Sequence, residues 1–197
     1  MHRLTVAILA GGAATRLHGV DKGLMPLNGR PLIAWVVDSL DQNASWPCLI
    51  VANRNIEEYS RFAPTISDLL KEEFGGPLAG VAAALSASES EWLYTVPVDG
   101  VHANPMVASR LLQRALECNV DSVVAHDGRR RQPLFAVYRC SLAESAGNAL
   151  DSGCGVSRWQ DSINTLEIDC SDLGEGWNNL NTVEDFLATA QRLQSHE

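Results

Sequence analysis

Apolar runs alternate with helical patterns along most of the chain. The runs have the length of buried strands and cover residues 4–9, 48–52, 92–96, 122–125 and 133–138. Apolar residues at helical spacing mark the segments between the first four runs, at residues 31–40, 76–86 and 107–115. Buried strands that alternate with helices are typical of a parallel sheet with helices on both faces. We therefore predict an α/β fold, a three-layer sandwich around a mostly parallel central sheet.

The remaining sequence indicates a single domain. Residues 154–178 are less regular, and residues 169–178 have the polar, turn-forming composition of a loop. A last helix is expected after Asn181, where Thr182 and Asp185 resemble a capping box. Neither an internal repeat nor a linker rich in Pro, Gly or Ser divides the 197 residues. We predict one domain over residues 1–197.

Charge and cysteine content restrict the kind of partner. Fifteen Lys and Arg stand against 24 Asp and Glu, a formal net charge of −9. Such a chain is a poor general ligand for nucleic acid, because that affinity comes from neutralising phosphates. The five cysteines are scattered without a C-x-x-C pair, which favours a reduced, cytoplasmic protein. We expect no membrane partner, because no apolar run approaches the roughly 20 residues of a membrane span.

A glycine-rich segment directly follows the first predicted strand. Residues 9–22 read LAGGAATRLHGVDK and place glycines close to Arg16 and Lys22. Backbone N–H groups of such a loop bind anions, and glycine lets the backbone approach a phosphate closely. The loop would lie at the carboxyl edge of the sheet, where α/β proteins bind ligands. It therefore predicts a polyphosphate site, with a plain glycine turn as the alternative; its spacing fits neither a Walker A loop nor a dinucleotide fingerprint.

An acidic residue occupies the same predicted edge. Asp99 follows the strand predicted at residues 92–96, so its carboxylate is expected to face the ligand crevice. Mg²⁺ is usually held by one or two carboxylates together with substrate phosphates. Asp99 is thus a candidate metal ligand; the alternative is an Asp that caps a turn before Pro105.

The chain resembles the molybdenum cofactor guanylyltransferases through motifs that occur in the family's order. These are L-A-G-G at Leu9–Gly12 with R-x-x-G-x-D-K-G from Arg16, Asn53-Arg54-Asn55, G-P-L-A-G at Gly76–Gly80, the P-V-D ending at Asp99, and Asn179-Leu180-Asn181-Thr182. Two positions depart from the family pattern: His18 stands where Gly is common, and Gly100 follows Asp99 where a Thr-Pro pair is usual.

The resemblance implies a Rossmann-like nucleotidyltransferase that transfers GMP from GTP to molybdenum-bound molybdopterin and releases pyrophosphate. It implies Mg²⁺ as the cofactor, held by Asp99, with Lys22 and Arg16 stabilising the phosphates. It also allows for proteins that deliver molybdopterin. The other residues that it places around the substrates are Leu9, Ala10, Gly11, Gly12, Gly19, Asn53, Asp68, Gly76, Pro77, Leu78, Asn179 and Asn181.

Several alternatives stay open at this point. A related nucleotidyltransferase could use CTP or a sugar phosphate, and a regulatory module could bind a nucleotide without catalysis. Asn179 and Asn181 could bind the pterin or its phosphate, or act only as helix caps. The run Arg129-Arg130-Arg131 lies between two predicted strands. It is either a solvated hairpin turn or a site for the phosphate or pterin of the second substrate.

Overall fold

A seven-stranded sheet forms the centre of the molecule, in the order β5-β4-β1-β6-β8-β7-β9. The computed structural model describes residues 3–10, 21–41, 46–68, 76–100 and 103–173. Strand bounds are β1 Leu4–Leu9, β4 Cys48–Val51, β5 Thr65–Ile66, β6 Trp92–Pro97, β7 Ser122–His126, β8 Arg131–Arg139 and β9 Leu166–Asp169. Strand β8 is antiparallel to both of its neighbours, whereas the other adjacent pairs are parallel. Strands β2 (Pro26–Leu27) and β3 (Arg30–Pro31) form a separate ribbon.

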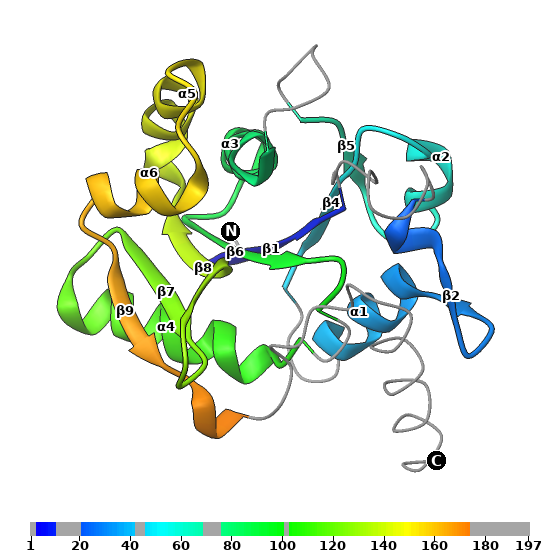
Figure 1. The fold of residues 1–197 in the computed structure, drawn as a ribbon, viewed down its shortest axis with the longest axis horizontal. Coiled ribbons are helices and arrows are strands. Elements are labelled where there is room, and N and C mark those ends of the chain that lie inside the picture. Colours follow the sequence, from blue (N-terminus) through cyan, green and yellow to red (C-terminus); the bar gives the residue numbers. More distant parts are fainter. Residues whose placement is uncertain (1–2, 11–20, 42–45, 69–75, 101–102, 174–197) are drawn as a thin grey trace.

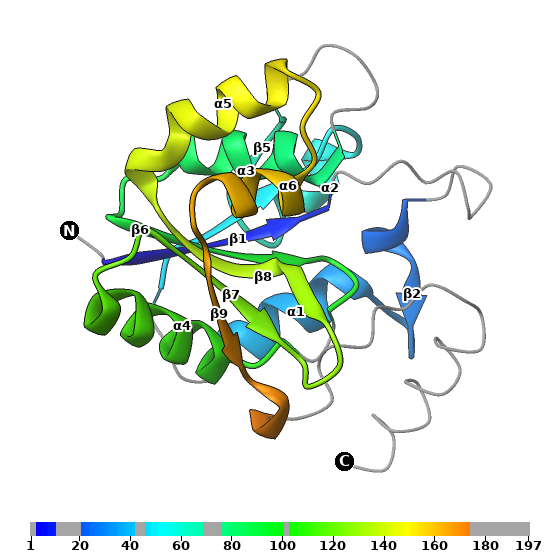
Figure 2. The same ribbon diagram turned by 60° about the vertical axis from the view of Figure 1, so that its left-hand side comes forward.

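Helices cover both faces of the sheet. On one face lie α3 (Gly76–Ala87), α5 (Ala143–Asp151) and α6 (Val156–Ser162), and on the other α1 (Leu32–Asp41) and α4 (Pro105–Cys118) (Figures 1 and 2). The short elements are α2 (Ile56–Tyr59) and the 3₁₀ turns η2 (Lys22–Leu24), η3 (Cys140–Leu142) and η4 (Ser171–Leu173). The predicted three-layer architecture is confirmed. No helix in the described parts of the chain is long and apolar enough to cross a bilayer.

Successive side chains along a strand point to opposite faces of the sheet, so the apolar core has one part on each face. In β1, Val6 and Ile8 pack with α1 and α4, whereas Ala7 packs with α3. Helix α3 is apolar on most of its surface, and its residues 78–85 are buried between the sheet and α5. The apolar side chains packed on the two faces hold the strands in place, and the candidate site lies at the ends of these strands.

The structure also shows elements that the sequence patterns did not predict. Helices α5 and α6 and strand β9 fall in or beside the stretch expected to be irregular. Helix α6 is too short to show a clear periodicity, and β9 is an edge strand with alternating exposure. The predicted last helix, with Thr182 and Asp185, lies outside the described residues.

Candidate active site

Asp99 lies where the two central strands of the sheet end side by side. Leu9 of β1 is paired with Pro97 of β6, and the N–H of Val98 donates to the Leu9 carbonyl at 3.1 Å. The Gly100 N–H donates to the Pro97 carbonyl at 3.0 Å and turns the chain. These contacts place Asp99 at the carboxyl edge of the sheet, next to the end of β1. Its side chain is largely buried, with 9% of the residue exposed.

Lys22 forms an ion pair with Asp99. Its Nζ lies 2.7 Å from Asp99 Oδ2, and the two side chains are 21% and 12% exposed. Two of the residues predicted to be catalytic are thus in direct contact, although 77 positions separate them in the sequence. An ion pair this protected from solvent interacts more strongly than one on an open surface, because water screens it less.

Asp21 anchors the turn that carries Lys22. Its carboxylate accepts hydrogen bonds from the Gly23 N–H at 3.2 Å, from Asn55 Nδ2 at 2.9 Å and from the Tyr59 hydroxyl. Burial, followed by this hydrogen bond to Asp21, raises the pKa of Tyr59 well above its usual value, so the phenol remains a donor. The sequence placed Asp21 and Asn55 in motifs but gave no sign that Tyr59 joins them.

Gly23 allows this turn to pack closely. A Cβ atom at this position would lie 2.3 Å from the Tyr59 hydroxyl and 2.8 Å from Val98 Cγ2. We expect Gly23→Ala to lower the free energy of unfolding by about 1–3 kcal/mol, because overpacking must displace side chains or backbone. Chemical denaturation measures this loss.

Gly147→Ala is the matched control for this substitution. A Cβ on Gly147 meets no atom within 4 Å, and the residue lies inside α5. The control should be neutral or stabilising, because Ala favours a helix more than Gly does. Equal stability of Gly23→Ala and the wild type would show that the turn is not tightly packed.

Asn53 and Asp68 form a second polar pair at the same edge. Asn53 Nδ2 donates to Asp68 Oδ2 at 2.6 Å, and the Asp68 N–H donates to Asn53 Oδ1 at 3.0 Å. Asp68 follows β5, which lies three strands away from β6 in the sheet. At the usual strand spacing this separation is roughly 14 Å. The pair therefore lies on the far side of β1 from Asp99.

The G-P-L-A-G motif begins helix α3 beside the end of β1. Gly76 has a φ of +61°, in the left-handed region that favours glycine. The Leu78 side chain is fully buried, so only the backbone of this residue could reach a ligand. A Cβ on Gly80 would lie 3.2 Å from Leu9 Cδ2, so a glycine here lets the helix pack against β1.

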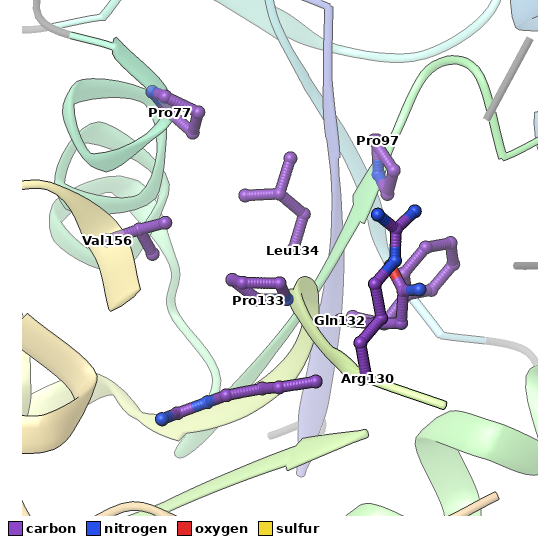
Figure 3. Close-up of a pocket in the computed structure, with 9 residues that line it drawn as sticks. Pro77, Pro97, Arg130, Gln132, Pro133, Leu134 and Val156 are labelled. Atoms are coloured by element: carbon purple, nitrogen blue, oxygen red, sulfur yellow. The ribbon is translucent and has the colours of Figure 1, made fainter. Parts of the chain in front are cut away.

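A cavity of about 310 Å³ opens on the other side of β6 (Figure 3). The start of α3, the end of β6, the start of β8 and the start of α6 surround it. The lining residues are Pro77, Pro97, Arg130, Arg131, Gln132, Pro133, Leu134, Phe135 and Val156. Gly100, which departs from the family's sequence pattern, packs against one of these residues. A Cβ at this position would lie 3.0 Å from Phe135 Cζ, so the tight space explains a glycine.

Several predicted site residues lie outside the described residues. These are Gly11, Gly12, Arg16, Gly19, Asn179 and Asn181, together with the departure at His18. Among the residues that are described, no group of three or more His, Cys, Asp or Glu side chains could hold a metal ion. Any metal bound at Asp99 would therefore need other ligands, such as substrate oxygens or water.

The fold and the residues at this edge define a nucleotidyltransferase-type α/β domain. A crystal structure of molybdopterin-guanine dinucleotide biosynthesis protein A from Archaeoglobus fulgidus matches with a TM-score of 0.79 at 24% identity, covering 98% of this chain and 100% of that one. A structure of CMP:2-keto-3-deoxy-manno-octonic acid synthetase complexed with CTP matches with a TM-score of 0.73 at 12% identity, covering all of both chains. At these identities the likeness concerns the fold.

The chain belongs to the family of MobA-like NTP transferase domains, which matches residues 6–163. It is 37% identical over 184 residues to the molybdenum cofactor guanylyltransferase of Vibrio cholerae, covering 91% of this chain and 87% of the relative. The protein of the same name from Yersinia pseudotuberculosis is 35% identical over 185 residues, with 92% of each chain covered. The resemblance found in the motifs is confirmed.

Proposed function

We propose that the protein transfers GMP from GTP to molybdenum-bound molybdopterin, forming the guanine dinucleotide and pyrophosphate. The observation that carries this proposal is the contact between Lys22 and Asp99 at the carboxyl edge of the sheet. Relatives named molybdenum cofactor guanylyltransferase, which align with more than nine tenths of the chain, supply the substrates.

The reaction needs no covalent enzyme intermediate. An oxygen of the acceptor phosphate attacks the α-phosphorus of GTP in line, and the bond from that phosphorus to the bridging oxygen of pyrophosphate breaks. The chain's task is to position the two substrates and to neutralise charge as it builds on the leaving group. Lys22 is suited to this task, because its ammonium is a compact charge that can contact several phosphate oxygens.

The carboxylate of Asp99 fits a magnesium ion. It is a hard oxygen ligand at the ligand edge, and one carboxylate is sufficient where phosphates complete the coordination. When bound there, Mg²⁺ would polarise the phosphates and stabilise the leaving pyrophosphate. Lys22 contacts one oxygen of this carboxylate, Oδ2. The ammonium and the carboxylate that would hold the metal therefore stand together where the phosphates would bind.

The choice of GTP rests on sequence rather than on the fold. A protein of the same fold binds CTP, so the L-A-G-G and G-P-L-A-G motifs carry the assignment.

GTP with Mg²⁺ is expected to raise the melting temperature more than ATP or CTP, because a ligand that binds only the folded state stabilises it. Inorganic tripolyphosphate with Mg²⁺ is the control that isolates the contribution of the phosphates. Equal protection by CTP would remove the guanine assignment.

Pyrophosphate release tests the proposed reaction directly. Release from GTP that requires molybdopterin is the expected result. Release from CTP, or with a sugar phosphate as acceptor, would identify a different nucleotidyltransferase. Tight GTP binding without any release of pyrophosphate would identify a nucleotide-binding module.

A further inference from the structure

The turn between β7 and β8 is held rigidly by Asp127. Its Oδ1 accepts the backbone N–H groups of Arg129 and Arg130 at 2.8 and 2.7 Å, and its Oδ2 accepts from Gln132 Nε2. Burial opposes ionisation, but these three hydrogen bonds, together with the positive charge of Arg130, outweigh it and hold the pKa of Asp127 below its ordinary value. Arg129 and Arg130 therefore belong to a hairpin turn whose backbone these contacts hold in place, and Arg131 is the first residue of β8.

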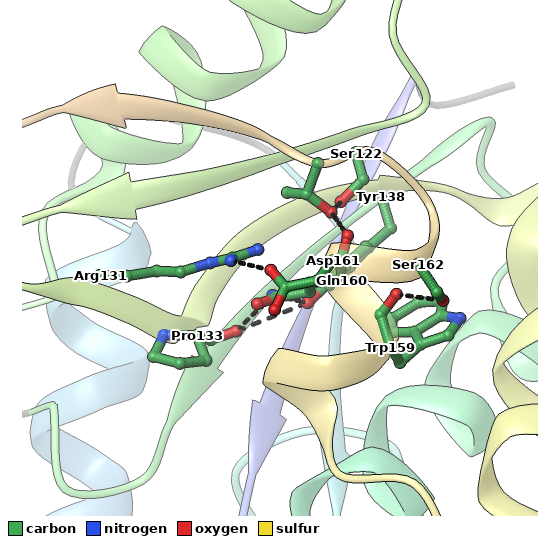
Figure 4. A network of polar contacts seen from close by, with 9 residues as sticks. Ser122, Arg131, Pro133, Tyr138, Trp159, Gln160, Asp161 and Ser162 are labelled. Carbon is green, nitrogen blue, oxygen red and sulfur yellow. Dashed lines mark hydrogen bonds and ion pairs between the residues drawn. The ribbon is translucent and has the colours of Figure 1, made fainter.

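The three arginines of this turn differ in what their guanidinium groups do. Arg131 pairs with Asp161 through Nη1 (Figure 4). Arg129 does not line the cavity. Arg130 lines it and extends along its wall toward Pro97 (Figure 3). Among the described residues, the Arg130 guanidinium has no hydrogen bond and no ion pair within 4 Å, and its charge acts on Asp127 only over a longer distance. The guanidinium can therefore still donate hydrogen bonds to a ligand.

The cavity combines this charge with apolar walls. Three prolines and the side chains of Leu134, Phe135 and Val156 form most of the lining. Arg131 Nε and Nη2 are buried and find no acceptor among the described residues. Buried donors without a protein acceptor are costly, and water or a ligand usually satisfies them. In a chain with a net charge of −9, such a lining favours a small ligand with an anionic group and a flat apolar face.

The cavity also lies beside the reacting centre. Pro97, on its wall, precedes Asp99 by two residues, which places their Cα atoms within about 7 Å. The end of β6 and the start of β8 line the cavity, together with the start of α3, a helix that also packs against β1. Asp99 follows β6 and therefore lies close both to the cavity and to the end of β1.

We propose that this cavity is the acceptor subsite, in which Arg130 binds the acceptor's phosphate and the walls formed by Pro97, Pro133 and Phe135 contact its ring system. This inference rests on the proposed function, which makes the acceptor a pterin phosphate. The acceptor then reaches the Asp99 region from the start of β8, while Pro77 and the rest of the G-P-L-A-G motif stay with the nucleotide. Arg130 holds the attacking phosphate through charge-assisted hydrogen bonds.

The test compares Arg130→Ala with Arg129→Ala, its neighbour in the same turn. Arg130→Ala should weaken equilibrium binding of molybdopterin at least tenfold and raise its KM similarly, since a hydrogen bond to a charged group contributes about 1.5–3 kcal/mol. The KM for GTP and the protection by GTP with Mg²⁺ should not change. Arg129→Ala should behave like the wild type, and Arg130→Lys should recover part of the binding, because it keeps the charge without the planar fork.

The outcomes separate this inference from the proposed function. Equal molybdopterin binding by the two alanine variants would overturn the role of Arg130, even if the wild type transfers GMP. Absence of molybdopterin binding by the wild type would overturn the subsite itself. Binding that depends on Arg130 without pyrophosphate release would uphold the subsite and contradict the proposed reaction. Because the Arg130 side chain is exposed, melting temperatures should be equal among the variants.

Discussion

Lys22→Ala is expected to lower kcat and kcat/KM together, on the order of 10²-fold or more. Negative charge builds on the pyrophosphate as the bond to the α-phosphorus breaks, so the ammonium stabilises the transition state more than the ground state. An interaction made mainly in the transition state lowers both constants, whereas one that only binds GTP raises KM and leaves kcat unchanged. Steady-state kinetics with GTP varied at saturating molybdopterin distinguish the two patterns.

A purely structural ion pair would give a different result. Arg30→Ala provides the matched control, because Arg30 and Asp38 form an exposed ion pair at 2.6 Å. Such pairs contribute about 0–1 kcal/mol, so the control should leave both kinetic constants within about fivefold of the wild type. If Lys22→Ala behaved like this control, the ammonium would have no part in transfer. The structure pairs Lys22 with Asp99, whereas the Asp21 carboxylate accepts hydrogen bonds from Gly23, Asn55 and Tyr59.

The same variant has a readout that does not depend on turnover. In the wild type, the Lys22 ammonium beside Asp99 repels a second cation that approaches this carboxylate. Mg²⁺ without nucleotide should therefore raise the melting temperature of Lys22→Ala more than that of the wild type. An identical response of both proteins would place the metal away from Asp99.

Asp99→Asn is the second substitution with a large expected effect, again a loss of turnover of 10²-fold or more. The amide keeps the size of the side chain but removes the charge that would hold the metal and that now pairs with Lys22. Losing a partly buried charged partner should also lower the free energy of unfolding by about 1–3 kcal/mol. The fold should persist, because Asp99 follows the end of β6 and is not part of the apolar core.

Asp68→Asn is the control for the position of the carboxylate. Asp68 lies at the same edge but follows β5, and Asn53 binds its carboxylate. We expect a smaller loss of kcat than in Asp99→Asn, measured with folded proteins at saturating GTP and molybdopterin. Near-normal turnover of Asp99→Asn, together with a large loss in Asp68→Asn, would move the metal to the β5 side of the sheet.

The sequence was sufficient for the parts of the fold that local patterns specify. Buried strands such as β1 and β6 are continuous apolar runs, and parallel strands end at one edge, so Asp99 could be placed at the same edge as the glycine-rich loop. That β6 pairs directly with β1 is known only from the structure. The pairing of Asp99 with Lys22 could not be predicted, because it depends on how the turn after the glycine-rich loop folds back. Tyr59 was missed for the same reason, since its hydroxyl reaches Asp21 across 38 positions.

The part of the sheet formed by β8, β7 and β9 was harder to predict from the sequence. The run at residues 133–138 predicted a strand but not its direction, which is set by pairing with β6 and β7. Strand β9 has four residues with alternating exposure, too few for a clear pattern. The cavity could not be foreseen at all, because its wall joins four elements that are distant in the sequence.

The reversed direction of β8 has a consequence for how substrate choice can change. In the parallel part of the sheet, the edge residues come from connections between a strand and a helix, and altering these disturbs the packing of a whole layer. Because β8 runs the other way, its first residues and the tip of a hairpin reach that edge instead. Within this hairpin, the Asp127 carboxylate fixes the backbone, while the arginine side chains at positions 129 and 130 are exposed. On the proposed acceptor subsite, a change of side chain at the tip would therefore alter what the edge offers the acceptor and leave both the turn and the nucleotide half intact.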